Sequence, residues 1–154
     1  MFLTLVITTQ VLKRMVGRQS PFTSTKSGGE WHPFTNLATY QANVSNYDAL
    51  PSGHLATIMA TITILAGNYP SNKYIKPVGY SLMGLLGYAM MNNSVHWAGD
   101  YPIAIAIGYT FGKIALSRGQ KTIHKKSTLT GYKSSLMPLF FGQNGYGLSY
   151  RLIF

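Results

Sequence analysis

The stretch PVGYSLMGLLGYAMMNNSVHWAGDYPIAIAIGYTFGKIAL, residues 77–116, contains two apolar runs joined by a short polar segment. The runs cover residues 77–91 and 101–116, and the segment between them carries His96 and Asp100. Asp100 is one of only three acidic residues in the chain. A carboxylate next to apolar segments is costly unless it is paired or used. The stretch therefore predicts two helices whose polar junction has a function.

Two more apolar runs come earlier, at residues 2–12 and 55–67. Extending the second run back to Pro51 and the third on to Asn93 brings both to roughly 17 residues, near the length of a spanning helix. We expect an all-α fold, a polytopic helical membrane bundle of about four apolar helices. Buried helices of a soluble all-α domain are the alternative. Because Met1 already lies within an apolar run, either upstream helices are missing from this chain or it never had them.

The composition favours a membrane protein over a soluble enzyme. Charged residues make up 10% of the 154 residues, against about 25% in soluble domains. The absence of Cys excludes disulfides and thiolate metal sites. The formal net charge is +10, and the basic residues cluster at the ends of apolar runs, a pattern that suits anionic headgroups. We expect a membrane partner and no nucleic acid, and the oligomeric state is left open.

The chain divides into a membrane-embedded helical core at residues 1–117 and a basic C-terminal tail at residues 118–154. An outer loop at residues 19–50 interrupts the core and is long enough to have a function. In the tail, Asn144-Gly145 between apolar flanks predicts a short β-hairpin. The positive-inside rule places the tail in the cytoplasm. We therefore expect an integral protein of a bacterial inner membrane whose functional side faces the periplasm.

The tetrapeptide Pro51-Ser52-Gly53-His54 opens the second apolar run. Proline suits the first turn of a helix, and glycine lets a backbone come close to a ligand. The free N–H groups at the start of a helix favour an anion. A histidine at this place can donate a proton to a leaving oxygen.

His96 and Asp100 are four residues apart. At that spacing on a helical turn the carboxylate reaches the imidazole, fixes its tautomer and leaves the other nitrogen free to attack. If the second and third apolar runs form antiparallel helices, His54 and His96 face each other on one side. Lys13, at the end of the first run, joins them there.

The order and combination of these motifs resemble the type 2 phosphatidic acid phosphatase family, in the superfamily of bacterial acid phosphatases and vanadium haloperoxidases. The family pattern is K-x6-R-P, then P-S-G-H, then S-R-x5-H-x3-D. Residues 51–54 match the second motif in full, and His96 with Asp100 match the end of the third. Lys13 and Pro21 match part of the first.

The resemblance implies a membrane phosphatase, a phosphoric monoester hydrolase that acts on a lipid phosphate or a related phosphomonoester or pyrophosphate without cofactor or metal. It implies that His96 is the nucleophile and forms a phosphohistidine, that Asp100 orients it, and that His54 protonates the leaving group. Three residues would hold the phosphate oxygens: Lys13, Ser52 and Gly53.

The chain departs from the family at both arginines. Ser20 stands where the first motif has arginine, and Ala89 and Met90 stand where the third motif has Ser-Arg. A guanidinium is a bidentate phosphate ligand that serine and methionine cannot imitate. Arg18 is the expected phosphate-binding substitute, with Arg14 as the alternative. Two other readings stay open: a pseudophosphatase that binds anionic headgroups without turnover, and a truncated remnant.

Overall fold

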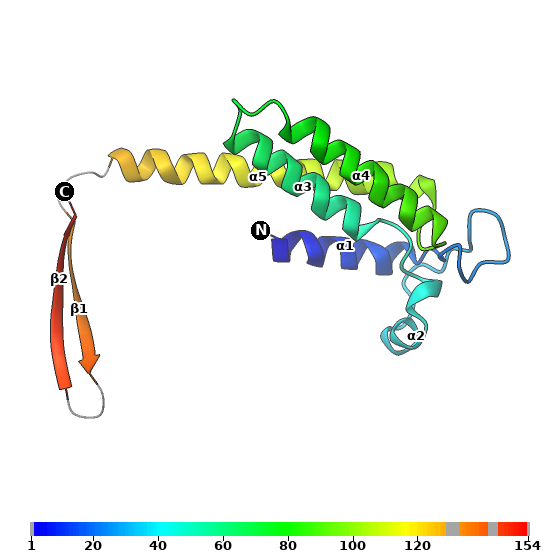
Figure 1. The fold of residues 1–154 in the computed structure, drawn as a ribbon. Helices are drawn as coiled ribbons and strands as arrows, with labels where there is room; N and C mark the ends of the chain where they lie inside the picture. The colour runs from blue at the N-terminus through cyan, green and yellow to red at the C-terminus, as the bar shows by residue number, and fades with distance from the viewer. Residues whose placement is uncertain (1, 129–132, 142–144, 154) are drawn as a thin grey trace. The chain divides into compact units, whose positions relative to one another are not determined.

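The computed structural model describes residues 2–128, 133–141 and 145–153 of the chain (Figure 1). It contains two compact units, Met1–Ser117 and Arg118–Phe154. The helices, with two short 3-10 turns, are α1 (Phe2–Val16), α2 (Leu37–Ala42), η1 (Val44–Asn46), α3 (Gly53–Asn68), α4 (Ile75–Asn92), η2 (Ala98–Asp100) and α5 (Tyr101–Thr128). The four long helices coincide with the four apolar runs, so the mostly helical architecture expected from the sequence is confirmed.

Helix α3 is the centre of the first unit and contacts both α1 and α4 (Figure 1). Its buried residues recur at helical spacing and form one continuous face: Leu55, Ala56, Met59, Ala60, Ile62 and Thr63. Residues from α1, α3, α4 and α5 meet in one apolar cluster: Leu5, Leu55, Ala56, Ala60, Met90 and Ala104. This cluster holds together the helix ends that carry the candidate site.

Helix α5 approaches α3 closely through two glycines. A Cβ on Gly108 would lie 2.2 Å from the carbonyl oxygen of Ala56, and a Cβ on Gly112 would lie 2.6 Å from the Cβ of Thr63. Small residues at this spacing allow two helix backbones to come together. Any larger residue at position 108 would force the two helices apart.

The predicted polytopic membrane bundle is confirmed only in its helical part. Among the residues that the structure describes, no helix combines the length and the apolar character that membrane crossing requires. Helices α1 and α3 have 15 and 16 residues, fewer than the roughly 20 of a typical span. Helix α5 is longer, but it continues beyond Ser117 into polar and basic sequence.

The second unit contains an antiparallel pair of strands, β1 (Lys133–Phe141) and β2 (Gly145–Ile153). Their register runs from Lys133 opposite Ile153 to Phe141 opposite Gly145. This pairing agrees with the β-hairpin expected in the tail. The connecting residues 142–144 lie outside the described residues.

The loop between α1 and α3 is tied to the end of α1. Arg18 forms isolated β-bridges with both Trp31 and Asp48, and the N–H of His32 donates to the carbonyl of Gly17 at 2.8 Å. Gly17 has φ +59, and a Cβ there would lie 1.9 Å from the carbonyl oxygen of His32. Only glycine fits this close approach, which brings the two sides of the loop together next to the candidate site.

Candidate active site

The start of α3 carries a hydroxyl without a partner. Ser52 precedes the first residue of α3 and is completely buried, and its Oγ has no hydrogen-bond partner within the described part of the chain. A buried hydroxyl in this state is costly. The backbone N–H groups of the first helical turn also lack intrahelical acceptors. Together they form a set of donors suited to an anion.

The next two residues of α3 lie toward open space. A Cβ built on Gly53 would have no atom within 4 Å. The side chain of His54 is exposed, and no hydrogen bond or ion pair of the described residues involves its imidazole. Both are therefore accessible to a ligand at this end of the helix.

His96 is buried, with 3% of its surface exposed. Its Nδ1 lies 2.7 Å from the carbonyl oxygen of Ala49. Because a carbonyl oxygen only accepts, Nδ1 carries the hydrogen and donates it, and Nε2 keeps its lone pair. This is the tautomer that a nucleophilic imidazole needs. The group that fixes it comes from the loop before α3, which sequence spacing did not indicate.

Asp100 is completely buried at the end of η2 and does have the partner that its position demanded. Its Oδ1 accepts from Arg18 Nη1 at 2.5 Å, and its Oδ2 accepts from the backbone N–H of Trp97 at 2.8 Å. The distance from His96 Nδ1 to Asp100 Oδ2 is 3.7 Å, within ion-pair range but too long for a hydrogen bond. The expected contact with His96 exists, but the strongest contacts of Asp100 are with Arg18 and Trp97.

Arg18 is held from several directions. Besides Asp100, its Nε and Nη2 donate to the carbonyl oxygen of Gly28 at 3.1 and 3.0 Å. Its guanidinium carbon lies 5.0 Å from the ring centre of Trp31 and 5.6 Å from that of Trp97, within cation–π range. Its predicted role as a phosphate ligand requires the guanidinium to leave these contacts.

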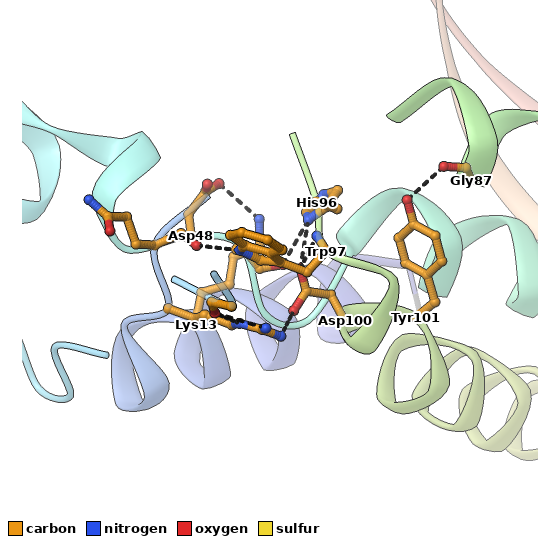
Figure 2. Close-up of polar contacts among 11 residues, drawn as sticks. Lys13, Asp48, Gly87, His96, Trp97, Asp100 and Tyr101 are labelled. Carbon is orange, nitrogen blue, oxygen red and sulfur yellow. Dashed lines mark hydrogen bonds and ion pairs between the residues drawn. The ribbon is translucent and has the colours of Figure 1, made fainter. Parts of the chain in front are cut away.

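Lys13, in the last turn of α1, is also buried and paired. Its Nζ lies 2.9 Å from Asp48 Oδ2, and 27% of the Asp48 side chain is exposed. An ammonium has three hydrogens to donate, and the Asp48 contact uses one of them. Figure 2 shows this pair close to His96, Trp97 and Asp100, and it shows the Tyr101 hydroxyl pointing toward the Gly87 carbonyl. The Tyr101 ring packs edge to face with the His96 ring, with ring centres 6.4 Å apart.

An aromatic pair lies in the segment between α1 and α3. Tyr40 stacks on Tyr47 with ring centres 6.0 Å apart, and the guanidinium carbon of Arg14 lies 5.9 Å from the Tyr40 ring centre. Burial raises the pKa of Tyr40, and the negative charge of Asp48 raises it further, while Arg14 opposes the shift. Arg14, the alternative substitute for the missing arginines, therefore faces an aromatic ring.

The two positions at which the chain departs from the arginine pattern are both buried. Met90 belongs to the apolar cluster of the helix core. Ser20 is 3% exposed, and its N–H donates to the carbonyl of Ser45 at 2.9 Å. A guanidinium at position 90 would have to lie among hydrocarbon side chains. The apolar packing of this core therefore suits methionine at position 90 and disfavours arginine.

The structure brings part of the predicted site together in one connected contact network. In this network Lys13 pairs with Asp48, and the neighbouring Ala49 carbonyl accepts from His96. Asp100 lies beside His96 and pairs with Arg18. Among the described residues, no hydrogen bond or ion pair connects Ser52 or His54 to this contact network. No group of three or more metal-binding side chains occurs among them either.

Asp48 and Ala49 were missed by the sequence analysis. Ala49 acts through its carbonyl, which leaves no signal in the side-chain pattern. Asp48 had a signal that could have been used, because a chain with three acids and a net charge of +10 rarely leaves an acid unpaired. All three acids do form ion pairs: Lys13–Asp48, Arg18–Asp100 and Lys26–Glu30.

A family model covers this part of the chain. The model of the PAP2 superfamily matches residues 1–123, which include every residue of the candidate site. The chain belongs to the PAP2 superfamily, and membership supports a hydrolase of the phosphatase type. No curated protein and no solved structure matches the chain.

Proposed function

We propose that the protein hydrolyses phosphate monoesters through a phosphohistidine on His96. The observation that carries this proposal is the 2.7 Å hydrogen bond from His96 Nδ1 to the Ala49 carbonyl. It leaves the Nε2 lone pair as the nucleophile. Membership of the PAP2 superfamily supports the same class of reaction.

The first half-reaction transfers the phosphoryl group to the ring. His96 Nε2 forms a bond to phosphorus, the ester P–O bond breaks, and His54 donates a proton to the departing oxygen. The ring keeps its Nδ1–H and becomes positively charged. The Asp100 carboxylate, 3.7 Å from Nδ1, stabilises that charge. In the second half-reaction water attacks phosphorus, the N–P bond breaks, and His54 takes the proton from water.

The phosphate oxygens need donors in place of the two missing arginines. Ser52 Oγ is buried and lacks a partner within the described chain, and the N–H groups that begin with Gly53 form the first turn of α3. Lys13 supplies the positive charge: its ammonium donates to a phosphate oxygen either in addition to Asp48 or in place of it. These three groups are the proposed phosphate site.

The proposed substrate is a lipid phosphate or a related small ester, and the proposed location is a bacterial inner membrane with the site on the periplasmic side. The support comes from apolar side chains exposed on the first unit. Those on α1 are Leu3, Val6, Ile7, Val11 and Met15, and those on α4 include Val78, Leu82, Leu85 and Tyr88. With the net charge of +10, such faces suit a bilayer with anionic headgroups.

The test is phosphate release together with trapping of the phosphoenzyme. Purified protein in detergent is given radiolabelled phosphatidic acid in mixed micelles or p-nitrophenyl phosphate. The wild type should release phosphate and form an acid-labile adduct, and His96→Gln should lose both. His32→Gln is the matched control, because His32 is an exposed histidine paired with Glu30 at 3.4 Å. Release that survives in His96→Gln would exclude the proposed nucleophile.

A second candidate function is phosphate binding without turnover. It is favoured by one observation: Lys13 and Arg18, the two basic residues of the contact network around His96, already pair with acids. A protein of this kind would bind vanadate and phosphatidic acid vesicles. It would release phosphate neither from phosphatidic acid nor from p-nitrophenyl phosphate. Vanadate binding accompanied by release selects the phosphatase instead.

A further inference from the structure

Arg18 connects to both polar groups that lie near His96 Nδ1, the Ala49 carbonyl and the Asp100 carboxylate. Its backbone carbonyl accepts the N–H of Ala49 at 3.0 Å, and the carbonyl of the same Ala49 accepts the His96 Nδ1–H at 2.7 Å. Its guanidinium donates to Asp100 at 2.5 Å, and Asp100 is the carboxylate nearest to that ring nitrogen. One residue thus links the hydrogen-bond acceptor of His96 with the negative charge beside it.

Asp100 extends this link into the backbone that carries His96. Its Oδ2 accepts the N–H of Trp97, the residue directly after His96, at 2.8 Å. The indole Nε1–H of Trp97 in turn donates to the carbonyl of Gln19, the residue directly after Arg18, at 2.8 Å. The segments that contain Arg18 and His96 are therefore tied together twice, once through the Asp100 side chain and once through the Trp97 ring.

The guanidinium itself has little freedom to move. Three of its nitrogens donate to protein groups, one to Asp100 and two to the Gly28 carbonyl. Trp31 and Trp97 lie within cation–π range, and only 12% of the side chain is exposed. To bind phosphate, it would have to leave a completely buried carboxylate without a counter-charge.

We propose that Arg18 is a positioning residue for His96 and not a phosphate ligand. It holds the Ala49 peptide and the Asp100 carboxylate so that the imidazole keeps its hydrogen on Nδ1 and its lone pair on Nε2. This inference deepens the proposed phosphatase mechanism and rests on it. It also accounts for an arginine two residues before the family position: there it serves the nucleophile, and Ser20 occupies the ligand position.

The two roles of Arg18 predict different kinetics. Loss of a phosphate ligand weakens the hold on the phosphoryl group in both the ground state and the transition state, so kcat/KM falls and inhibition by vanadate weakens with it. Loss of a positioning residue leaves the phosphate site intact and misplaces the nucleophile, so the change falls on kcat. A misplacement of about 1 Å costs roughly a hundredfold in rate.

Two variants of the pair remove the link without leaving a lone buried charge. Arg18→Lys preserves the counter-charge of Asp100, but an ammonium cannot reproduce the planar fork that joins Asp100 to Gly28. The double variant Arg18→Met with Asp100→Asn removes both charges, so that no lone charge is buried. Lys26→Met is the matched control, because it breaks an exposed ion pair of the same loop.

The first readout is kinetic. Arg18→Lys and the double variant should lower kcat by roughly ten- to a hundredfold, with KM and vanadate inhibition within about threefold of wild type. Lys26→Met should match the wild type in all three quantities. A fall in kcat/KM accompanied by weaker vanadate inhibition would make Arg18 a phosphate ligand and overturn the proposal, as would an unchanged kcat.

The second readout needs no turnover. Nitrogen-15 NMR of histidine-labelled protein, assigned by comparison with His96→Gln, reports which ring nitrogen of His96 carries the hydrogen. The wild type and Lys26→Met should show the Nδ1–H form alone, and the double variant should show a mixture with Nε2–H. An unmixed Nδ1–H form in the double variant overturns the positioning role. A wild type without phosphate release refutes the proposed function instead, and the NMR result still decides the role of Arg18.

Discussion

Two buried ion pairs lie in the first unit, and they differ in the surroundings of the acid. Beside Lys13, the Asp48 side chain keeps 27% of its surface exposed, whereas Asp100 beside Arg18 is completely buried. Asp48 can turn toward water when another anion reaches Lys13. Asp100 has no such route, because a lone buried charge is strongly unfavourable.

The cations differ in the same direction. Lys13 is an ammonium that uses one of its three hydrogens on Asp48, while Arg18 donates to Asp100 and Gly28 and faces two tryptophan rings. A cation with an exchangeable partner is suited to bind substrate, and one whose partners are fixed is suited to hold other residues. Charge and proximity alone do not separate these roles; the exposure of the partner does.

The largest difference between the pairs is expected in stability. Arg18→Met leaves the completely buried Asp100 carboxylate without its counter-charge and should lower the free energy of unfolding by about 3–5 kcal/mol. Lys13→Met leaves Asp48, whose side chain is 27% exposed and can be solvated, and should cost about 1 kcal/mol or less. Denaturant unfolding of both variants in the same detergent measures the contrast. Equal losses would show that the two pairs are equivalent and would remove the basis of the comparison.

The next effect is on binding of the phosphoryl group. Lys13→Met should lower kcat/KM by about a hundredfold, the usual cost of removing one charge-stabilising group, and should weaken vanadate inhibition in parallel. Lys13→Arg, which keeps the charge, is the control and should recover part of the loss. Vanadate inhibition that does not change in Lys13→Met would contradict the assignment of Lys13 as a phosphate ligand.

The helices were predictable from the sequence, and the partner of Asp100 was not. The apolar runs identify the four long helices because each helix must bury an apolar face. The spacing of His96 and Asp100 indicated a contact across one helical turn, but the chain there is not α-helical. Ser94 has φ +57 and Trp97 has an extended backbone. In the segment from His96 to Asp100, only Ala98–Asp100 form the 3-10 turn η2.

The dominant contact of Asp100 crosses 82 positions of sequence, and no local pattern reports such a contact. The same holds for the Ala49 carbonyl, 47 positions from His96. Ser52 and His54, by contrast, could be placed at the start of α3 because Pro51 and the following apolar run mark the beginning of a helix. Local sequence signals therefore located the start of α3, the proposed anion-binding end, whereas the arrangement of the proposed nucleophile depends on how the loop between α1 and α3 folds back.

A smaller effect is expected from freeing Lys13. Asp48→Asn removes the competing carboxylate, so the ammonium becomes available to an incoming anion. Vanadate should inhibit this variant at concentrations lower by about fivefold or less, since a partly exposed ion pair contributes about 1 kcal/mol at most. Titration of turnover with vanadate gives the constant. Weaker inhibition would mean that Asp48 holds Lys13 in position and does not compete with the ligand.

The smallest effect concerns the third ion pair, Lys26–Glu30, which is exposed and serves as the reference for the other two. The hydrogen bond with Lys26 lowers the pKa of the Glu30 carboxyl, and the same bond raises the pKa of Lys26. The contribution of the Glu30 carboxylate to folding stability is therefore present above the ordinary glutamate pKa, and it is lost as pH falls through the lowered pKa. That of Lys26 is present below the ordinary lysine pKa and lost as pH rises through the raised value.

Glu30 is the only glutamate in the chain, so a carbon-13 label on glutamate reports its titration without overlap. In Lys26→Met the pKa of Glu30 should rise toward its ordinary value, with a small lowering left from His32. Stability and turnover near neutral pH should stay at the wild-type level, because solvent screens an exposed pair. If Lys26→Met instead lowered kcat as Arg18→Lys is expected to do, the loop as a whole would govern His96, and the distinction between buried and exposed pairs would fail.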